Sequence, residues 1–428
     1  MTPELYRALT TLVTPLIRVH LARRARRGKE DAARLDERWG AAGRARPEGA
    51  LIWVHGASVG EGLSALPLAG RLLEARPDAH LLITTGTVTS AAMIRERLPE
   101  RAFHQYVPVD LPHAVARFLD HWRPELVLWV ESELWPNILF AIRERKIPLI
   151  LVNGRMSDRS LARWRRFPGL IRPLLACFDL RLAQSEKDAG RFVQLGGSPI
   201  KTLGNLKYDA EPLAADEAAL EGLRARCADR PRWLAASTHP GEEAIAASVH
   251  ERLKRRLPNL LTIIVPRHAD RGAGLAAELA ARGLSLARRS AGEAPGAGTD
   301  LYLGDTMGEL GLFYRLAPIA FVGGSLVPHG GQNPLEPARL GSALIFGPHM
   351  ENFAEPVAAF LEGGAAEQVA DEAALAQAVE GLIRNEAARA RRAQAGRRIA
   401  SEMSGALERV AAELEPFLPE RVRIHAPA

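Results

Sequence analysis

Cysteine is scarce in this sequence of 428 residues, where Cys177 and Cys227 are the two that occur. Two cysteines this far apart form neither a disulfide framework nor a CxxC metal site, which favours a reduced compartment over a secreted protein. The sequence also lacks a DxD motif, a GxGxxG motif and any His/Cys cluster at ligand spacing. We therefore expect no metal and no other cofactor, and the absence of GxGxxG removes the main argument for a dinucleotide oxidoreductase.

Aromatic residues are few, at 6% of the chain, although basic residues gather in the clusters 18–29 and 163–167 and the net charge is +6. A basic nucleic-acid-binding protein needs aromatic side chains interleaved with its arginines, so nucleic acid is a remote alternative as a partner. The clusters suit an anionic lipid or a phosphorylated substrate, and a solvated surface is equally compatible with them.

The chain does not open with a run of about 20 apolar residues, the length that a transmembrane helix needs. Within residues 1–22 apolar side chains recur at helical spacing, interrupted by Arg7, Arg18 and His20, and the basic stretch RRARRGK follows. This pattern predicts an amphipathic helix over 1–22 that lies on an anionic membrane surface. A helix packed on the protein's own core is the alternative.

Beyond that helix, short β-rich runs alternate with longer helical patterns, which is typical of parallel sheets with crossover helices. The first set of runs comprises 51–57, 80–86, 104–110, 125–131, 148–154 and 180–185, and the second comprises 232–238, 260–268, 300–305, 317–324 and 343–348. The stretch 209–231 is poor in strand formers and is expected to hold the linker and the first helix of the second half. The sequence therefore predicts an α/β fold of two doubly wound, Rossmann-like domains that face each other across a cleft.

Glu61 stands just after the first predicted strand and the turn SVG, at the start of a helical pattern. Ligands of doubly wound sheets bind beyond the carboxyl ends of the strands, so we expect this glutamate at the mouth of the cleft. A carboxylate there can act as a general base toward an incoming hydroxyl. The alternative is structural, because S-x-x-E is the capping-box pattern and an acidic residue favours a helix N-terminus. The two roles are compatible only if one carboxylate oxygen faces the cleft.

Seven motifs, in their order and spacing, resemble the 3-deoxy-D-manno-octulosonic acid (Kdo) transferases of lipopolysaccharide synthesis. They are VHGASVGE (54–61), ESELWPN (131–137), NGRMSDRS (153–160), GNLKYD (204–209), PRH (266–268), GDTMGEL (304–310) and GGSLVPHGGQNPLEPA (323–338). Members of that family are GT-B glycosyltransferases that transfer Kdo from CMP-Kdo to a lipid A precursor, lipid IV(A), at the inner membrane. The resemblance implies the same activity here, with release of CMP and without a metal.

The resemblance places the family's catalytic residues on Glu61, Glu131 and Lys207. Glu61 would deprotonate the acceptor's sugar hydroxyl, and Glu131 would assist the transition state. Lys207 would neutralise the phosphate leaving group or the Kdo carboxylate, where a compact ammonium suits the high charge. From the residues alone, Glu131 could instead cap the helix begun by WPN, and Lys207 could be an ordinary surface lysine.

The resemblance places the donor site in the second half of the chain. Its residues are Arg267, His268, Met307, Gly308, Glu309, Asn333, Pro334, Leu335 and Glu336. Arg267 and His268 end a predicted strand and point to a phosphate or cytosine site, or are merely strand-terminal polar residues. Residues 307–309 open a predicted helix whose free N–H groups favour an anion or a base edge.

Residues 333–336 are typical of a helix start, with Asn333 as N-cap, Pro334 at the first helical position and Glu336 at the third. This pattern has a sufficient structural explanation by itself. The resemblance adds a binding role, in which Glu336 would accept hydrogen bonds from the ribose hydroxyls of CMP.

The implied organisation is a membrane-associating helix 1–22, an acceptor-binding domain 23–208, a linker 209–231 and a CMP-Kdo-binding domain 232–428, whose last helices are candidates for return to the first domain. The expected partners are CMP-Kdo, a lipid A precursor and the anionic surface of the inner membrane, on its cytoplasmic face. A nucleotide-sugar epimerase, or another nucleotide-sugar transferase, is the alternative function. An epimerase would keep the nucleotide site but needs neither a membrane helix nor an acceptor groove.

Overall fold

A computed structural model of the chain describes residues 1–131, 133–209, 212–227 and 230–419. The chain divides into two compact units, of which the first is Met1–Ala210 with Ser404–Ala428 and the second is Glu211–Met403. The second unit thus begins inside the stretch 209–231, where α10 (Glu217–Cys227) is its first helix. The C-terminal helix α18 (Ala406–Leu414) packs on α3 and belongs to the first unit, which agrees with the return of the last helices to the first domain that the prediction allowed for.

The described residues of the first unit form a parallel sheet of seven strands in the order β3-β2-β1-β4-β5-β6-β7. Its strands are β1 (Ala50–His55), β2 (Ala79–Thr85), β3 (Ala102–Tyr106), β4 (Leu126–Val130), β5 (Leu149–Gly154), β6 (Leu180–Ala183) and β7 (Lys201–Thr202). The strand order reverses between β1 and β4, both buried along their whole length. A parallel sheet binds its ligand at such a switch point, beyond the carboxyl ends of the two strands.

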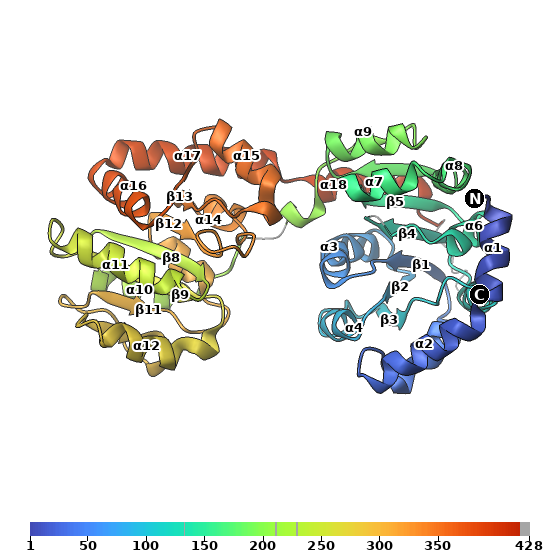
Figure 1. The fold of residues 1–428 in the computed structure, drawn as a ribbon, viewed down its shortest axis with the longest axis horizontal. Helices are drawn as coiled ribbons and strands as arrows, with labels where there is room; N and C mark the ends of the chain where they lie inside the picture. The colour runs from blue at the N-terminus through green and yellow to red at the C-terminus, as the bar shows by residue number, and fades with distance from the viewer. Residues whose placement is uncertain (132, 210–211, 228–229, 420–428) are drawn as a thin grey trace, which may run out of the picture. The chain divides into compact units, whose positions relative to one another are not determined.

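Helices cover both faces of this sheet (Figure 1). They are α3 (Val59–Ala75), α4 (Val88–Arg95), α5 (Pro112–Trp122), α6 (Pro136–Glu144), α7 (Asp158–Trp164), α8 (Pro168–Leu175), α9 (Glu186–Gln194) and α18. Large aromatic side chains fill the core on one face, among them the fully buried Trp53, Trp122 and Trp129.

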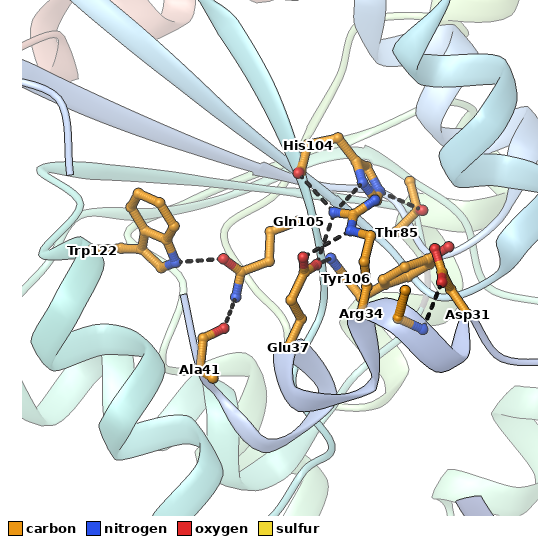
Figure 2. A network of polar contacts seen from close by, with 10 residues as sticks. Asp31, Arg34, Glu37, Ala41, Thr85, His104, Gln105, Tyr106 and Trp122 are labelled. Carbon is orange, nitrogen blue, oxygen red and sulfur yellow. Dashed lines mark hydrogen bonds and ion pairs between the residues drawn. The ribbon is translucent and has the colours of Figure 1, made fainter. Parts of the chain in front are cut away.

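Side chains from the 3-10 helix η1 (Ala32–Trp39) cover the edge strand β3, as Figure 2 shows. The Arg34 guanidinium donates to the Glu37 carboxylate at 2.7 and 2.8 Å and to the backbone carbonyl of His104 at 3.0 Å. The backbone N–H of Tyr106 donates to Glu37 Oε2 at 2.8 Å. An exposed edge strand invites pairing with other chains, so this ion pair protects the edge by occupying its backbone groups.

The described residues of the second unit form another seven-stranded parallel sheet, in the order β10-β11-β9-β8-β12-β13-β14. Its strands are β8 (Arg232–Thr238), β9 (Leu261–Pro266), β10 (Leu286–Arg288), β11 (Leu301–Leu303), β12 (Ile319–Val322), β13 (Ala343–Phe346) and β14 (Ala366–Gln368). Its further helices are α11 (Glu242–Lys254), α12 (Gly272–Ala280), α13 (Leu310–Leu316), α14 (Leu335–Leu340), α15 (Ala354–Glu362), α16 (Glu372–Arg384) and α17 (Glu386–Glu402). The switch point of this sheet lies between β8 and β12.

The two doubly wound parallel sheets confirm the predicted α/β class, but the N-terminal segment differs from its prediction. Residues 1–22 do not form one helix, because the chain breaks at Val13 into α1 (Pro3–Leu12) and α2 (Thr14–Arg26). Helix α1 lies against α5, α6 and α8, as Figure 1 also shows for α6, although none of its residues is buried. None of the described helices combines the length and the apolar character that crossing a bilayer requires.

Candidate active site

Glu61 is the third residue of α3 and follows β1 at the switch point of the first sheet. Ser58 caps this helix, since the Glu61 N–H donates to Ser58 Oγ at 3.3 Å. Glu61 Oε2 turns back and accepts the Ala57 N–H at 2.7 Å. The Ser58 side chain also hydrogen-bonds to this carboxylate. The Glu61 side chain therefore takes part in the helix cap, and the carboxylate still has lone pairs that can accept a proton.

Glu131 follows β4, the other strand of the switch point, and is 4% exposed. Its backbone is left-handed, with φ of 63°, although it is not glycine. Such a conformation is strained and occurs where the surroundings enforce it, often at active sites. Its Oε1 accepts from Lys207 Nζ at 2.5 Å, a pair in which the lysine stays 37% exposed.

Asparagine side chains hold Lys207 in place. The backbone N–H of Leu206 donates to Asn153 Oδ1 at 3.1 Å, and that of Lys207 donates to Asn205 Oδ1 at 3.0 Å. Lys207 Nζ also lies close to the start of α3, because a Cβ placed on Gly60 would be 3.9 Å from it. The structure therefore brings Glu61, Glu131 and Lys207 together at the carboxyl edge of one sheet.

Burial raises the pKa of Glu61, and the charge of Glu131 raises it further, while the Ala57 N–H acts in the opposite direction. A general base works best when its pKa approaches the operating pH, so this shift favours proton transfer. Capping of α6 is not the role of Glu131. The backbone N–H groups of Asn137 and Ile138 donate to the Asp110 carboxylate, at 3.2 and 2.9 Å.

A groove of about 580 Å³ opens beside this cluster. Ala57, whose N–H holds Glu61, lines it together with Trp135 and Asp110 on the strand-end side. Tyr6 and Ile17, from α1 and α2, also line it. The groove therefore connects Ala57, the residue whose N–H Glu61 accepts, with the N-terminal helices.

In the second unit, Arg267 and His268 follow β9 and are exposed to solvent. Glu336 is half-buried at the start of α14, and the charge of Arg267 is among those that act on it. Burial raises the pKa of Glu336, with the hydrogen bond from Asn333 Nδ2, at 3.2 Å, opposing the shift. The structure thus places the basic group of Arg267 and the Glu336 carboxylate near each other at the carboxyl edge of the second sheet.

Residues 307–309 do not open a helix as predicted, because α13 begins at Leu310. Gly308 has a left-handed φ of 82°, which a right-handed helix does not accommodate, and Met307 is 76% exposed. Glu309 pairs with Arg289, at 3.0 and 2.5 Å. This ion pair lowers the pKa of Glu309 and keeps its carboxylate charged.

The start of α14 is displaced by one residue from its prediction. Pro334 is the N-cap and Leu335 the first helical residue, whereas the sequence pattern assigns the cap to Asn333. Asn333 nevertheless caps the helix start, because its Oδ1 accepts the N–H of Leu335, two residues on, at 3.0 Å. Pro334 already has helical φ and ψ angles, so the predicted capping role of Asn333 is retained.

Sequence reasoning missed two side chains that organise these sites. Asn153, which fixes the Lys207 segment, opens the motif NGRMSDRS at the end of β5. Glu242, buried after β8 in the stretch HPGEE, holds backbone groups of a loop that contains GGS. The available signals were a polar residue inside a buried strand for Asn153, and an acidic residue at the start of the helix that follows a buried strand for Glu242.

The comparisons with known proteins agree with one family. The sequence model of "3-Deoxy-D-manno-octulosonic-acid transferase (kdotransferase)" matches residues 33–210, which include Glu61, Glu131 and Lys207. The 3-deoxy-D-manno-octulosonic acid transferase of Haemophilus influenzae is 36% identical over 97% of this chain and 99% of its own length. The chain belongs to the Kdo transferase family. It is therefore an enzyme, a glycosyltransferase.

Two further comparisons extend this assignment. A probable mitochondrial Kdo transferase of Arabidopsis thaliana is 38% identical over 89% of this chain and 88% of its own length. A crystal structure of UDP-GlcNAc 2-epimerase from Neisseria meningitidis, bound to UDP-GlcNAc, matches 85% of this chain and 99% of its own with a TM-score of 0.56. At 14% identity the epimerase shows a shared GT-B-like fold alone, so the family assignment rests on the Kdo transferases.

Proposed function

We propose that this protein transfers Kdo from CMP-Kdo to a sugar hydroxyl of a lipid A precursor, lipid IV(A), in lipopolysaccharide synthesis. The names of the relatives support Kdo transfer. The cluster of Glu61, Glu131 and Lys207 supports the chemistry, because it supplies a carboxylate of raised pKa beside a lysine and a second carboxylate. That cluster is the observation on which the proposal depends most.

Glu61 would accept the proton of the acceptor hydroxyl while the hydroxyl oxygen forms a bond to the anomeric carbon of Kdo. The bond between that carbon and the phosphate oxygen breaks, and CMP leaves with the electron pair. A neutral hydroxyl is a poor nucleophile at neutral pH, and base assistance is typically worth about 10²–10⁴-fold. The raised pKa of Glu61 suits this role.

Lys207 would meet negative charge on the donor, since its ammonium is partly exposed. Glu131 holds this ammonium at 2.5 Å, which orders the flexible lysine side chain before the donor arrives. Preorganised charges stabilise a transition state without reorganising during the reaction. Glu131 would therefore assist the reaction chiefly through Lys207.

The donor nucleotide would bind the second unit, at Arg267, His268, residues 307–309 and residues 333–336. Glu336 would accept hydrogen bonds from the ribose hydroxyls, and its proximity to Arg267 supports a combined ribose and phosphate site. Glu309 is already paired with Arg289, so its contribution would come from its backbone and from the fixed loop.

The groove beside Glu61 would hold the sugar part of the acceptor, and the N-terminal helices would face its acyl chains. Leu5, Leu9, Leu12, Leu16 and Val19 are between 45% and 77% exposed on α1 and α2. Arg23, Arg24 and Arg26 stand in the last turn of α2. Exposed leucines next to basic residues suit an anionic membrane interface, so we propose the cytoplasmic face of the inner membrane as the location.

Nucleotide release tests this proposal against the epimerase alternative. Incubation with CMP-Kdo should release CMP only when a lipid A precursor is present, and UDP-GlcNAc should remain unchanged. Binding of CMP but not UDP in calorimetry would accompany this result. Conversion of UDP-GlcNAc to its 2-epimer, without acceptor-dependent CMP release, would overturn the proposal.

A further inference from the structure

Glu242, the first residue of α11, is 1% exposed and lies at the switch point of the second sheet. Its Oε2 accepts the N–H groups of His239, at 2.9 Å, and Gly324, at 2.6 Å. Its Oε1 accepts the N–H groups of Ser325 and Leu326, both at 3.0 Å. One carboxylate thus joins the turn after β8 to the loop after β12.

The charge of Glu242 is met by backbone groups. Among the described residues no cation pairs with it, whereas its neighbour Glu243 pairs with Arg271 at 2.7 Å. Burying a carboxylate is costly unless hydrogen bonds replace the lost water, and four N–H donors do so here. A glutamine could not substitute, because its amide has one acceptor oxygen and would direct an N–H₂ group at N–H donors.

The loop that Glu242 holds, residues 323–332, is closed on itself. The N–H of Gly331 donates to Gly324 O at 2.8 Å, and that of Gln332 donates to Gly323 O at 3.1 Å. Asn333 follows directly, and Glu336 lies three residues further on. Fixing the beginning of this loop therefore also fixes the point from which residues 333–336 start.

The same carboxylate brings two histidines together. The rings of His239 and His329 lie 3.8 Å apart between centroids, and Gln332 Nε2 is 3.0 Å from His239 Nε2. Gly324 is required at the contact, because it has φ of 67° and a Cβ there would be 3.1 Å from His239 Cδ2. The turn after β8 and the closed loop therefore form one fitted surface at the carboxyl edge of the sheet.

We propose that Glu242 is a positioning residue of the donor site, which holds loop 323–332 so that Glu336 meets the nucleotide. This inference rests on the proposed function, since it assumes that CMP binds at the second unit. Glu242 is too deeply buried to touch the donor itself, so it acts through the loop.

Glu242→Gln is the principal test, with Asp300→Asn as the matched control. Asp300 is also a buried carboxylate of the second unit, and it accepts the Ser285 N–H at 3.0 Å. Asp300 directly precedes β11, so it lies at the amino-terminal end of a strand, whereas Glu242 lies beyond the carboxyl ends of the strands. Both variants should lower the thermal midpoint, but only Glu242→Gln should weaken the binding of CMP.

We expect Glu242→Gln to weaken CMP binding about 10- to 100-fold in calorimetry, because small displacements of binding groups have effects of this size. The KM for CMP-Kdo should rise more than kcat falls. Hydrogen exchange in the peptide 323–332 should accelerate. A Glu242→Gln protein with lowered stability but wild-type CMP affinity and KM would overturn the inference.

If Glu242→Gln does not fold, Glu242→Asp replaces it in the same measurements. Aspartate keeps the negative charge, but its side chain is one methylene group shorter. Weakened CMP binding by folded Glu242→Asp supports the inference, and wild-type binding together with faster exchange in 323–332 overturns it. Failure of the wild-type protein to bind CMP would contradict the proposed function and the inference together. If the wild-type protein binds CMP and the Glu242 variants bind it equally well, the inference is wrong but the proposed function stands.

Discussion

At Glu61, the carboxylate accepts the Ala57 N–H and a hydrogen bond from the Ser58 side chain, and it keeps lone pairs that can accept a proton. A glutamine keeps this contact, since its carbonyl oxygen can accept the same N–H, but it cannot take a proton. The structural and chemical roles of the side chain are therefore separable by a single substitution.

Glu61→Gln should lower the transfer rate by about 10²–10⁴-fold, the usual contribution of a general base. Because burial and Glu131 raise the pKa of Glu61, ionising it costs the folded state free energy at neutral pH, and the thermal midpoint should stay unchanged or rise. The acid limb of kcat/KM in the wild-type protein should lie above about pH 4.3, the ordinary glutamate value. Near-normal turnover by a stable variant would refute the base assignment.

Glu336→Ala should weaken CMP binding by about 1–3 kcal/mol, the scale of hydrogen bonds to a charged group. Its effect on stability should be small, because the helix start is satisfied by Asn333. Asn333→Ala is the control and should cost about 0.5–2 kcal/mol of stability, as a lost cap does. Calorimetry and thermal melts separate the two effects. Unchanged CMP affinity in Glu336→Ala would rule out the ribose role.

The sequence located part of this site by physical argument. Ligands of doubly wound sheets bind beyond the carboxyl ends of the strands, and the long apolar run of β1 was enough to place Glu61 at such an end. The family resemblance supplied Glu131 and Lys207. The contact between those two depends on Asn153 and on a left-handed Glu131, and no local pattern encodes either feature. Glu242 was missed because its partners come from a loop about 80 residues later in the chain.

At the scale of elements, helix α1 presents two faces with different chemistry. One face docks on the first unit, where the Tyr6 hydroxyl donates to Asp110 at 2.9 Å and Asn137 donates to Thr10 at 2.9 Å. The other face exposes leucines. Deleting residues 1–22 would therefore uncover the sides of α5 and α6, and surface substitutions are the cleaner test of membrane binding.

Replacing Leu5, Leu9, Leu12 and Leu16 by serine should reduce flotation with anionic vesicles while leaving the thermal midpoint nearly unchanged. Each leucine that inserts contributes up to about 1.5–3 kcal/mol, and each nearby basic residue about 1 kcal/mol. Serine at the exposed Val193 and Leu361 is the matched control. High salt should detach the leucine variant more readily than the wild-type protein. Equal flotation of both would show that these helices are not the membrane-binding surface.

The docking of α1 should depend on pH through Asp110, whose pKa burial raises to about 6. An unfolded aspartate titrates near 3.9, so the stability that this group contributes is complete below about pH 4 and declines as the pH rises to about 6. Urea unfolding of the wild-type protein and Asp110→Asn should therefore show a difference that falls across this interval and is constant above it. A pH-independent difference for Asp110 would contradict this assignment.

The predicted strands correspond to the long buried runs, and the strands that were missed are short. β7, β10 and β14 have two or three residues each and lie at or next to sheet edges, where pairing with a formed neighbour rather than local sequence decides their existence. The break at Val13 was missed for a different reason, because its signal is local. Pro15, in the first turn of α2, has no backbone N–H to donate to the preceding turn and so ends the first helix, although apolar periodicity continues across the break.

At the scale of the whole molecule, the two units repeat one design. Each has a parallel sheet whose strand order reverses at its centre, between β1 and β4 and between β8 and β12. A glutamate follows the first strand of each switch point, Glu61 in the first unit and Glu242 in the second. The Glu61 carboxylate accepts one backbone N–H and a hydrogen bond from Ser58, whereas the Glu242 carboxylate accepts four backbone N–H groups. We interpret the units accordingly as catalytic and donor-binding.

The most direct test of this account is the mass of the lipid product. The wild-type protein and Glu61→Gln are each incubated with CMP-Kdo and a tetraacyl lipid A precursor, and the masses of the lipid products are measured by mass spectrometry. The account predicts that the wild-type protein adds one or more Kdo residues, and that Glu61→Gln binds CMP equally well but adds almost none. An unmodified precursor with the wild-type protein, or equal product from both proteins, would contradict it.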